Sequence, residues 1–299
     1  MRPACVLCLL VQVVVGVRRF FLFSDIGYDP YFGTEQGIPC QGQRPSEWGS
    51  PECASPGFLV NSMSRDMQAA APQFAISCGD LIENGRLNET EALNAFDFVA
   101  NSTRQSTHYS RMPKPTIVTA LGERDLGRST FSEQNSSAFL ENMAESLVNR
   151  SFLNHQAAAS FKRCGYYSLS EIRSLRIIVL NTEVWSFGRS ASPEGDPCGQ
   201  LRFLQDELNA VRESDAFAVI VGHKPPGIAI TAAGIEEVTP TTVRYWADSF
   251  QIQYQAIIAD NSDIISFQLF GHTGFFSFIA DMRISSSEKD DGLPLLMES

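Results

Sequence analysis

Acidic and imidazole side chains recur along this sequence directly after apolar runs. The runs and the residues that follow them read FFLFSDIG, FAISCGD, TIVTALGERD, FAVIVGHKPPG and IISFQLFGHTG. Of the four histidines, His223 and His272 stand in these loops, whereas His108 and His155 lie outside any motif. Imidazole and carboxylate groups together are ligands that Zn²⁺, Mn²⁺ or Fe²⁺ accept in proteins. The pattern indicates a candidate metal site, although each residue could instead be a helix N-cap or a hydrogen-bonded loop residue.

Strands that alternate with helices would have to position these loops. Apolar stripes at helical spacing predict helices over about residues 241–259 and over the segment GQLRFLQDELNAVRE. The alternation is typical of an α/β sheet with helices on both faces and with chemistry at the carboxyl ends of its strands. We expect one domain at 17–283, followed by an acidic tail at 284–299.

Composition and charge exclude several classes of partner. The 299 residues carry a formal net charge of −11, which disfavours nucleic acid and adsorption to anionic membranes. The apolar segment 264–280 contains Gln268, His272 and two glycines, so it is expected to form two strands joined by a loop and not a membrane span. We expect a small-molecule or protein partner and no transmembrane anchor.

The N-terminus resembles a secretory leader. One arginine, an apolar run and small residues near the end of MRPACVLCLLVQVVVG predict a signal peptide at 1–16. Sequons at Asn88, Asn101, Asn135 and Asn149 fit passage through a secretory pathway. The expected location is therefore secreted or lumenal, with endolysosomal compartments included.

The cysteines outside the leader are odd in number. Cys40 and Cys53 flank a segment rich in glycine and proline that has little means of holding itself together, so a disulfide between them is the first choice. Cys164 and Cys198 are the second candidate pair. Cys78 lies in an apolar run, where we expect a buried thiol.

The loop residues, taken in order, resemble those of the calcineurin-like metallophosphoesterases, whose loops read DxH, GD, GNHD, GH and GHxH. The phrases FSDIGYDPYF, SCGDLIENG, LNTEVW, GQLRFLQDEL, GHKPPG and FGHTG narrow this resemblance to the acid-sphingomyelinase-like branch. It implies a metallophosphoesterase-type β-sandwich core flanked by helices, with ligand loops at the carboxyl ends of the strands. It also implies a phosphodiester or phosphomonoester substrate, with a lipid head group among the candidates.

The resemblance implies that this chain keeps possible ligands at all the positions of one metal site of the family. The matching positions hold Asp80, Glu123, His223 and His272. Glu123 stands where the family has a neutral asparagine, so its charge would make a metal-activated water harder to deprotonate. We expect one divalent metal ion, with zinc as the first choice and manganese or iron as alternatives.

The other metal site of the family lacks both of its histidines here. Gly27 and Gly274 occupy those positions, which leaves Asp25 and the shared Asp80. Two carboxylates from separate loops hold a cation weakly. Asp25 is therefore expected to be a weak ligand that also orients or deprotonates an attacking water.

Arg124 stands where the family has its catalytic histidine. A guanidinium stays protonated and cannot protonate a leaving alkoxide, but it can bind a phosphate and neutralise developing charge. Glu123 and Arg124 could alternatively pair with each other or with Asp125. Two hypotheses follow: a secreted single-metal phosphodiesterase with impaired activity, or an inactive pseudoenzyme that binds a phosphate-containing ligand or a protein. The oligomeric state stays open.

Overall fold

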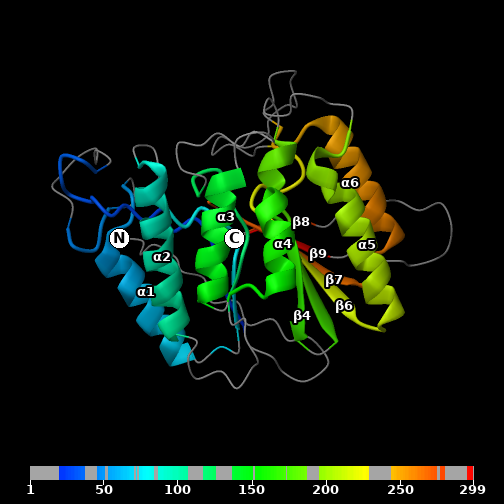
Figure 1. Ribbon diagram of the computed structural model, residues 1–299, viewed down its shortest axis with the longest axis horizontal. Helices are drawn as coiled ribbons and strands as arrows, with labels where there is room; N and C mark the ends of the chain where they lie inside the picture. The colour runs from blue at the N-terminus through cyan, green and yellow to red at the C-terminus, as the bar shows by residue number, and fades with distance from the viewer. Residues whose placement is uncertain are drawn as a thin grey trace.

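Two β-sheets pack face to face in this chain, and helices cover the outer face of each sheet (Figure 1). The computed structural model describes residues 20–37, 46–50, 53–70, 72, 74–83, 87–106, 117–125, 137–150, 152–172, 174–186, 195–228, 244–274, 277–279 and 295–298. The expected leader at 1–16 and the sequon at Asn135 lie outside these residues. The α/β class and the sandwich of two sheets flanked by helices, both expected from the sequence, are confirmed.

The first sheet is short, parallel and buried. Its strands are β1 (Phe20–Phe23), β2 (Phe74–Ser77) and β3 (Ile117–Thr119), in that order. Strands that are covered on both faces need apolar or small residues at every position, which is why these segments show no alternation. The helices of this half are α1 (Gly57–Ala70), α2 (Glu89–Ser106), α3 (Ser137–Asn149) and α4 (His155–Cys164).

The second sheet is larger and has the order β4-β5-β6-β7-β9-β8. Its strands are β4 (Tyr167–Ile172), β5 (Leu175–Val179), β6 (Phe217–Val221), β7 (Ile265–Phe270), β8 (Ser277–Ile279) and β9 (Leu295–Glu298). The strands from β5 to β9 in this order run parallel, whereas β4 and β8 are antiparallel to their neighbours. The 3₁₀ helix η1 (Thr182–Trp185) follows β5, and η2 (Pro197–Gly199) leads into α5 (Gln200–Glu213).

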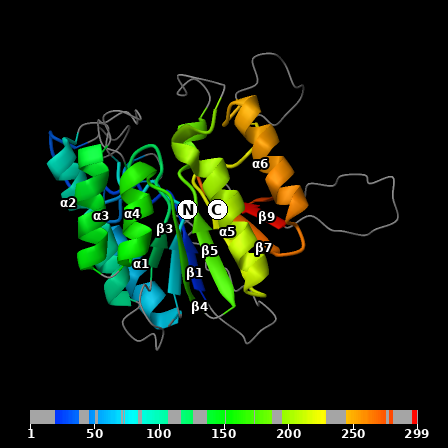
Figure 2. The same ribbon diagram turned by 45° about the vertical axis from the view of Figure 1, so that its right-hand side comes forward.

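The central strands of the large sheet serve two cores. In β6, Val219 and Val221 point into the core shared with the first sheet, while Ala218 and Ile220 pack on the side of α5 and α6 (Asp248–Asp260). Phe20 of β1 stacks on Phe267 of β7 with ring centroids 6.0 Å apart, which joins the two sheets. Figure 2 shows the resulting layers, with the sheets between α2–α4 and α5–α6.

Two segments differ from their expected structure. Helix α6 begins at Asp248 and not near residue 241, because Trp246 forms an isolated bridge with Ser186 and donates from Nε1 to the Lys224 carbonyl at 3.1 Å. Residues 295–298, expected within an acidic tail, form β9 between β7 and β8. Their sequence LLME is apolar enough to add a strand to the sheet. The two strands expected within 264–280 are present as β7 and β8.

The disulfide expected between Cys164 and Cys198 is confirmed, and it ties the end of α4 to the start of α5. Cys53 is also disulfide-bonded, and its expected partner Cys40 lies outside the described residues. Cys78 carries a buried thiol, as expected.

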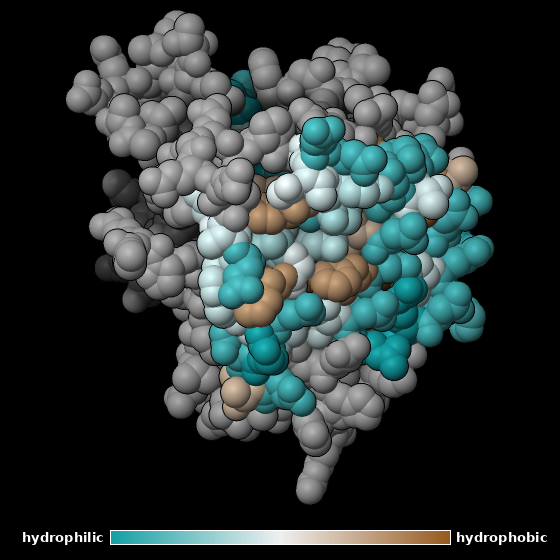
Figure 3. Space-filling view, turned by 90° about the vertical axis from the view of Figure 1, so that its left-hand side faces the viewer, coloured by the Kyte–Doolittle hydropathy of each residue, from teal (hydrophilic) through white to brown (hydrophobic). Residues whose placement is uncertain are grey.

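The outer surface is mostly hydrophilic. On the face formed around α1 and α2, apolar side chains occur as separate patches in a polar surround (Figure 3). Trp48 and Phe58 are the exposed aromatic pair of this region, with ring centroids 4.4 Å apart. None of the helices in the described part of the chain is long and apolar enough to cross a bilayer.

Candidate metal centre

Loops from both sheets meet at the carboxyl ends of the parallel strands. The loops after β1 and β2 carry Asp25 and Asp80, and those after β6 and β7 carry His223 and His272. Backbone hydrogen bonds join the loops in pairs: Asp25 donates to the Gly79 carbonyl at 3.0 Å, and Gly271 donates to the His223 carbonyl at 2.9 Å. The parallel strand direction thus brings residues from distant parts of the chain to one edge.

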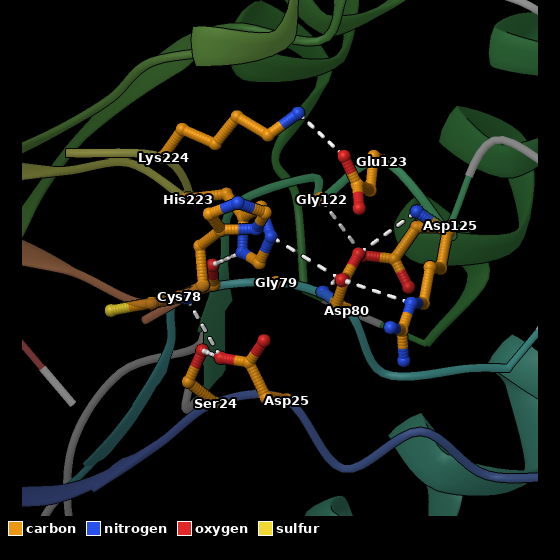
Figure 4. A network of polar contacts seen from close by, with 12 residues as sticks. Ser24, Asp25, Cys78, Gly79, Asp80, Gly122, Glu123, Asp125, His223 and Lys224 are labelled. Atoms are coloured by element: carbon orange, nitrogen blue, oxygen red, sulfur yellow. Dashed lines mark hydrogen bonds and ion pairs between the residues drawn. The ribbon is translucent and has the colours of Figure 1, made fainter. Parts of the chain in front are cut away.

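Asp80, His223 and His272 form a compact donor cluster. One ligand atom from each lies within 4.8 Å of the others. Asp80 and His223 are buried, His272 is half-buried, and the two imidazole rings meet edge to face at 5.1 Å between centroids. Figure 4 shows His223 directed toward Asp80. The structure therefore brings together three residues that the sequence identified as candidate ligands.

The ring of His223 is oriented for ligation through Nε2. Its Nδ1 lies 2.8 Å from the Cys78 carbonyl, which can only accept a hydrogen bond, so Nδ1 carries a proton. Nε2 is buried and faces the Asp80 carboxylate, with 3.3 Å between Nε2 and Oδ2. Burial alone would lower the pKa of His223, but the contact with Asp80 and the nearby carboxylates raise that pKa to about 9. A metal ion would therefore displace a proton from Nε2.

The two other members of the cluster differ in charge. Burial and the positive charges of His223 and Lys224 lower the pKa of His272 to about 4, so its imidazole is neutral at pH 7. Burial would raise the pKa of Asp80, but the contact with His223 and the Arg124 backbone N–H outweigh burial and lower it. The cluster thus offers an anionic carboxylate and a neutral imidazole beside His223.

Three non-glycine residues of the centre have left-handed backbone conformations. The φ angles are 54° at Asp25, 52° at Asp80 and 73° at His272. Such conformations cost about 1–3 kcal/mol each and concentrate at functional sites. Close packing of the loops adds a further restriction, because a Cβ atom on Gly122 would overlap the Asp80 carboxylate.

Asp25 borders the cluster and holds the His272 loop in place. Its Oδ2 accepts hydrogen bonds from the His272 backbone N–H at 2.9 Å and from Ser24 Oγ at 2.5 Å. The Asp25 side chain is exposed to solvent. Its roles as a weak ligand and as a group that orients water stay predictions, because Oδ2 is already engaged by the loop.

Glu123 is turned toward Lys224. Its Oε2 lies 2.5 Å from Lys224 Nζ (Figure 4). The same ammonium lies 3.0 Å from the buried Glu183. Glu123 is not a member of the donor cluster of Asp80, His223 and His272. The alternative considered from the sequence, an ion pair for Glu123, thus has a counterpart here, but the cation is Lys224.

Arg124 is fixed against the acidic loop after β2. Its backbone N–H donates to Asp80 Oδ1 at 2.8 Å, and its guanidinium lies 2.5 Å from Glu83 Oε2 and 3.7 Å from Asp80 Oδ2. The side chain is 47% exposed, so part of the guanidinium still faces solvent. Arg124 therefore lies where it can meet a phosphate while it also screens Asp80.

The two glycines that replace family histidines have room around them. A Cβ on Gly27 would meet no atom nearer than Glu83 Oε2 at 4.0 Å, and a Cβ on Gly274 would meet nothing within 4 Å. Both have positive φ angles, 58° and 66°, which a side chain would make strained. Backbone conformation, and not lack of space, therefore opposes larger residues here.

Asp125 joins the loops after β2 and β3 through its buried carboxylate. Oδ2 accepts from the backbone N–H groups of Asp80 at 2.8 Å and Gly122 at 3.0 Å, while Oδ1 accepts from Leu81 at 2.7 Å and Ile82 at 3.3 Å. Burial and then the charge of Asp80 raise the pKa of Asp125 to about 7. The sequence placed Asp125 in the motif but assigned it no role beyond pairing.

Sequence reasoning also missed Lys224, Glu183 and Tyr245. Lys224 directly follows the candidate ligand His223. A lysine next to loops rich in acidic residues indicates an ion pair, and this pairing was not considered from the sequence. Glu183 lies in η1, and its burial could not be read from the phrase LNTEVW. Tyr245 packs edge to face on His272 at 5.2 Å between ring centroids.

Comparison with known proteins agrees with the resemblance stated from the motifs. The chain is 27% identical over 278 residues to the acid sphingomyelinase-like phosphodiesterase 3b of Mus musculus, a match that covers 87% of this chain and 58% of the relative. It is 28% identical over 233 residues to the sphingomyelinase phosphodiesterase C of Dictyostelium discoideum, covering 76% and 49%. The chain thus spans about half the length of these curated relatives. No family model matches the sequence.

The fold also matches a solved structure. A dimetal phosphatase from Danio rerio superposes with a TM-score of 0.55 at 12% sequence identity, covering 93% of this chain and 86% of that chain. At this identity the match shows the fold and not the activity. The chain therefore has the fold of this dimetal phosphatase, and its similarity to proteins named acid sphingomyelinase-like phosphodiesterase and sphingomyelinase phosphodiesterase confirms the resemblance stated from the motifs.

Substitution of Asp125 by Asn should loosen the centre. The amide keeps one acceptor oxygen and turns its NH₂ group toward backbone N–H donors, which leaves buried donors without a partner. We expect Asp125→Asn to lower the free energy of unfolding by about 1–3 kcal/mol in urea titrations. The matched control Asp206→Asn, exposed on α5, should leave the urea midpoint unchanged. Equal midpoints for the two variants would contradict the role given to Asp125.

Proposed function

We propose that this chain is a metal-dependent phosphoric ester hydrolase of the acid-sphingomyelinase-like type that binds one divalent metal ion. The observation that carries the proposal is the donor cluster, in which Asp80, His223 and His272 each place a ligand atom within 4.8 Å of the others. His223 turns its buried Nε2 toward Asp80 Oδ2 at 3.3 Å. A divalent ion on the three donors would take the place of the proton between these two side chains.

The donor set fits such an ion. Two imidazoles and one carboxylate suit Zn²⁺, Mn²⁺ or Fe²⁺, and they leave positions open for substrate. The Cys78 carbonyl accepts a hydrogen bond from His223 Nδ1 and so fixes the tautomer of the ring, as the hydrogen-bond partners of metal-binding histidines commonly do. Carboxylates also gather around the cluster, where Asp80 and Glu83 contact Arg124, and Glu123 and Glu183 contact Lys224. Zinc remains the first choice.

The side chains would divide the work on a phosphoric ester. A bound divalent ion would supply Lewis acidity toward the phosphoryl group and activate water for attack. Arg124 presents a half-exposed guanidinium to bind phosphate oxygens and to neutralise developing charge. Asp25 holds the His272 loop and is placed to orient a water through its exposed carboxylate. The similar family has a histidine at the Arg124 position, which can protonate the leaving group, and none of these side chains takes over that role. We therefore expect slow release of a strongly basic leaving group.

The proposed class of substrate is based on the names of the similar proteins. Those relatives are named phosphodiesterases of the sphingomyelinase type. We infer a small phosphodiester or an activated phosphomonoester, with a lipid head group as a candidate.

The second candidate function is a pseudoenzyme that binds a phosphate-containing ligand or a protein without turnover. It is favoured by Glu123, which pairs with Lys224, and by Gly27 and Gly274, which offer no ligand atoms. Both hypotheses share the fold and differ in metal content and turnover.

Secretion is the third part of the proposal. The disulfide between Cys164 and Cys198 favours an oxidising compartment. Asn88 and Asn149 are exposed and can carry glycans, whereas Asn101 is half-buried and accepts a hydrogen bond from Arg150 Nε at 3.1 Å.

Loss of His223 should remove the metal. We expect the parent protein to contain one metal equivalent by elemental analysis and to hydrolyse a chromogenic phosphodiester. His223→Ala should lose both properties, together with the thermal stabilisation that a metal bound only by the native state provides. The control His155→Ala, exposed at the start of α4, should keep them. Metal without turnover in the parent would favour the pseudoenzyme, and equal metal content in parent and His223→Ala would overturn the site.

Restoring both missing histidines should add a second metal equivalent. Gly27→His together with Gly274→His would place imidazoles beside Asp25 and Asp80, at a cost of about 1–3 kcal/mol for each strained backbone position. Adding Arg124→His should then raise phosphodiester turnover by roughly 10²–10⁴-fold, because leaving-group protonation returns. The single glycine variants serve as controls and should bind no extra metal. A folded double variant with the metal stoichiometry of the parent would show that the two glycines are not paired vacancies.

Expression in a eukaryotic secretory host should yield a processed glycoprotein. We expect a mature chain that begins near Val17 and carries glycans at Asn88 and Asn149 in preference to Asn101, as judged by intact mass and glycopeptide analysis. Asn88→Gln should remove one glycan mass. A product that retains Met1 and has no glycan would contradict secretion.

A further inference from the structure

Lys224 is held at both ends. Its backbone N–H donates to Thr182 Oγ1 at 2.8 Å, and its carbonyl accepts from Trp246 Nε1 at 3.1 Å. Its ammonium lies 3.0 Å from Glu183, whose side chain is fully buried in η1. The ammonium therefore occupies a fixed position, and Glu123 is its more exposed partner.

The position of Glu123 follows from that fixed cation. The side chain of Lys224 is 9% exposed and that of Glu123 is 29% exposed, so their contact at 2.5 Å is only partly screened by water. An ammonium in such surroundings attracts a carboxylate more strongly than a solvated one does. Glu123 immediately precedes Arg124, whose backbone N–H binds Asp80, so Glu123 lies next to the donor cluster. Its carboxylate is near enough to Asp80 and His272 to act on their charge, but its Oε2 is bound by Lys224.

We propose that Lys224 is a positioning residue that keeps Glu123 off the metal and so sets both the ligand number and the metal affinity of the centre. The inference rests on the proposed function in one respect, namely that Asp80, His223 and His272 bind a divalent ion. With Lys224 in place the centre has three protein ligands. Without it, the Glu123 carboxylate becomes the fourth.

Removal of Lys224 alone would leave Glu183 buried without its cation, which is strongly destabilising. The informative variant is therefore Lys224→Met with Glu183→Gln, which removes one charge of each sign and preserves shape. The matched control is Lys162→Met with Glu145→Gln, the same exchange in an exposed ion pair between α4 and α3. A third variant combines Lys224→Met/Glu183→Gln with Glu123→Ala. It lacks the carboxylate that loss of Lys224 would free to bind the metal.

The experiment titrates chelator-treated full-length protein with Zn²⁺ and Co²⁺. We expect Lys224→Met/Glu183→Gln to bind Zn²⁺ at least about tenfold more tightly than the parent, in line with the effect of groups that surround metal ligands. The Co²⁺ ligand-field spectrum should change with the new donor. Both effects should disappear when Glu123→Ala is added, and the surface control should match the parent.

Other results would overturn the inference. A gain in affinity that survives Glu123→Ala would mean that the Lys224 ammonium merely repels the metal, and no gain in a folded variant would mean that Glu123 does not reach it. If the variant fails to fold, Glu123→Gln in the parent decides: Zn²⁺ affinity within a few-fold of the parent supports the inference, and a loss above about tenfold overturns it. A parent protein that binds no metal refutes the proposed function. If Lys224→Met/Glu183→Gln binds metal when the parent does not, the role of Lys224 is still supported. If neither binds metal, both fail.

Discussion

The buried carboxylate of Asp125 is the interaction on which the centre depends. It gathers backbone N–H groups from the loops after β2 and β3, and so fixes the turn in which Asp80 adopts its left-handed conformation. Asp80 in turn contacts His223 from the second sheet and the backbone of Arg124. A carboxylate outside the donor cluster thus determines where the candidate ligands lie.

Charge balance at the centre is shared between side chains. Arg124 lies against Glu83 and Asp80, and Lys224 lies against Glu123 and Glu183. In a two-metal site, the charge of the carboxylates is neutralised largely by the ions. Here the protein cations Arg124 and Lys224 neutralise part of the carboxylate charge and hold the loops against one another.

The sequence contained enough information for the fold and for the cluster of Asp80, His223 and His272. These residues follow apolar runs, and parallel strands bring such positions to one edge whatever their separation in the chain. The direction of the Glu123 side chain depends on a choice between the cluster and Lys224, which is 101 residues away. The outcome of this competition depends on burial and on distances in space, which the spacing of residues along the chain does not give. The start of α6 was missed for a similar reason, since Trp246 continues the apolar stripe but its indole binds the Lys224 loop.

The left-handed positions of the centre fall into two groups. At Gly27 and Gly274, the positive φ is accommodated by a residue without a side chain. At Asp25, Asp80 and His272, the backbone is equally left-handed but carries a side chain. Glycine would relieve about 1 kcal/mol or more at each of these three positions. The contacts between the loops offset that strain, because Asp25 binds the His272 backbone and Asp80 contacts His223, so the same side chains that form the cluster also hold its strained backbone.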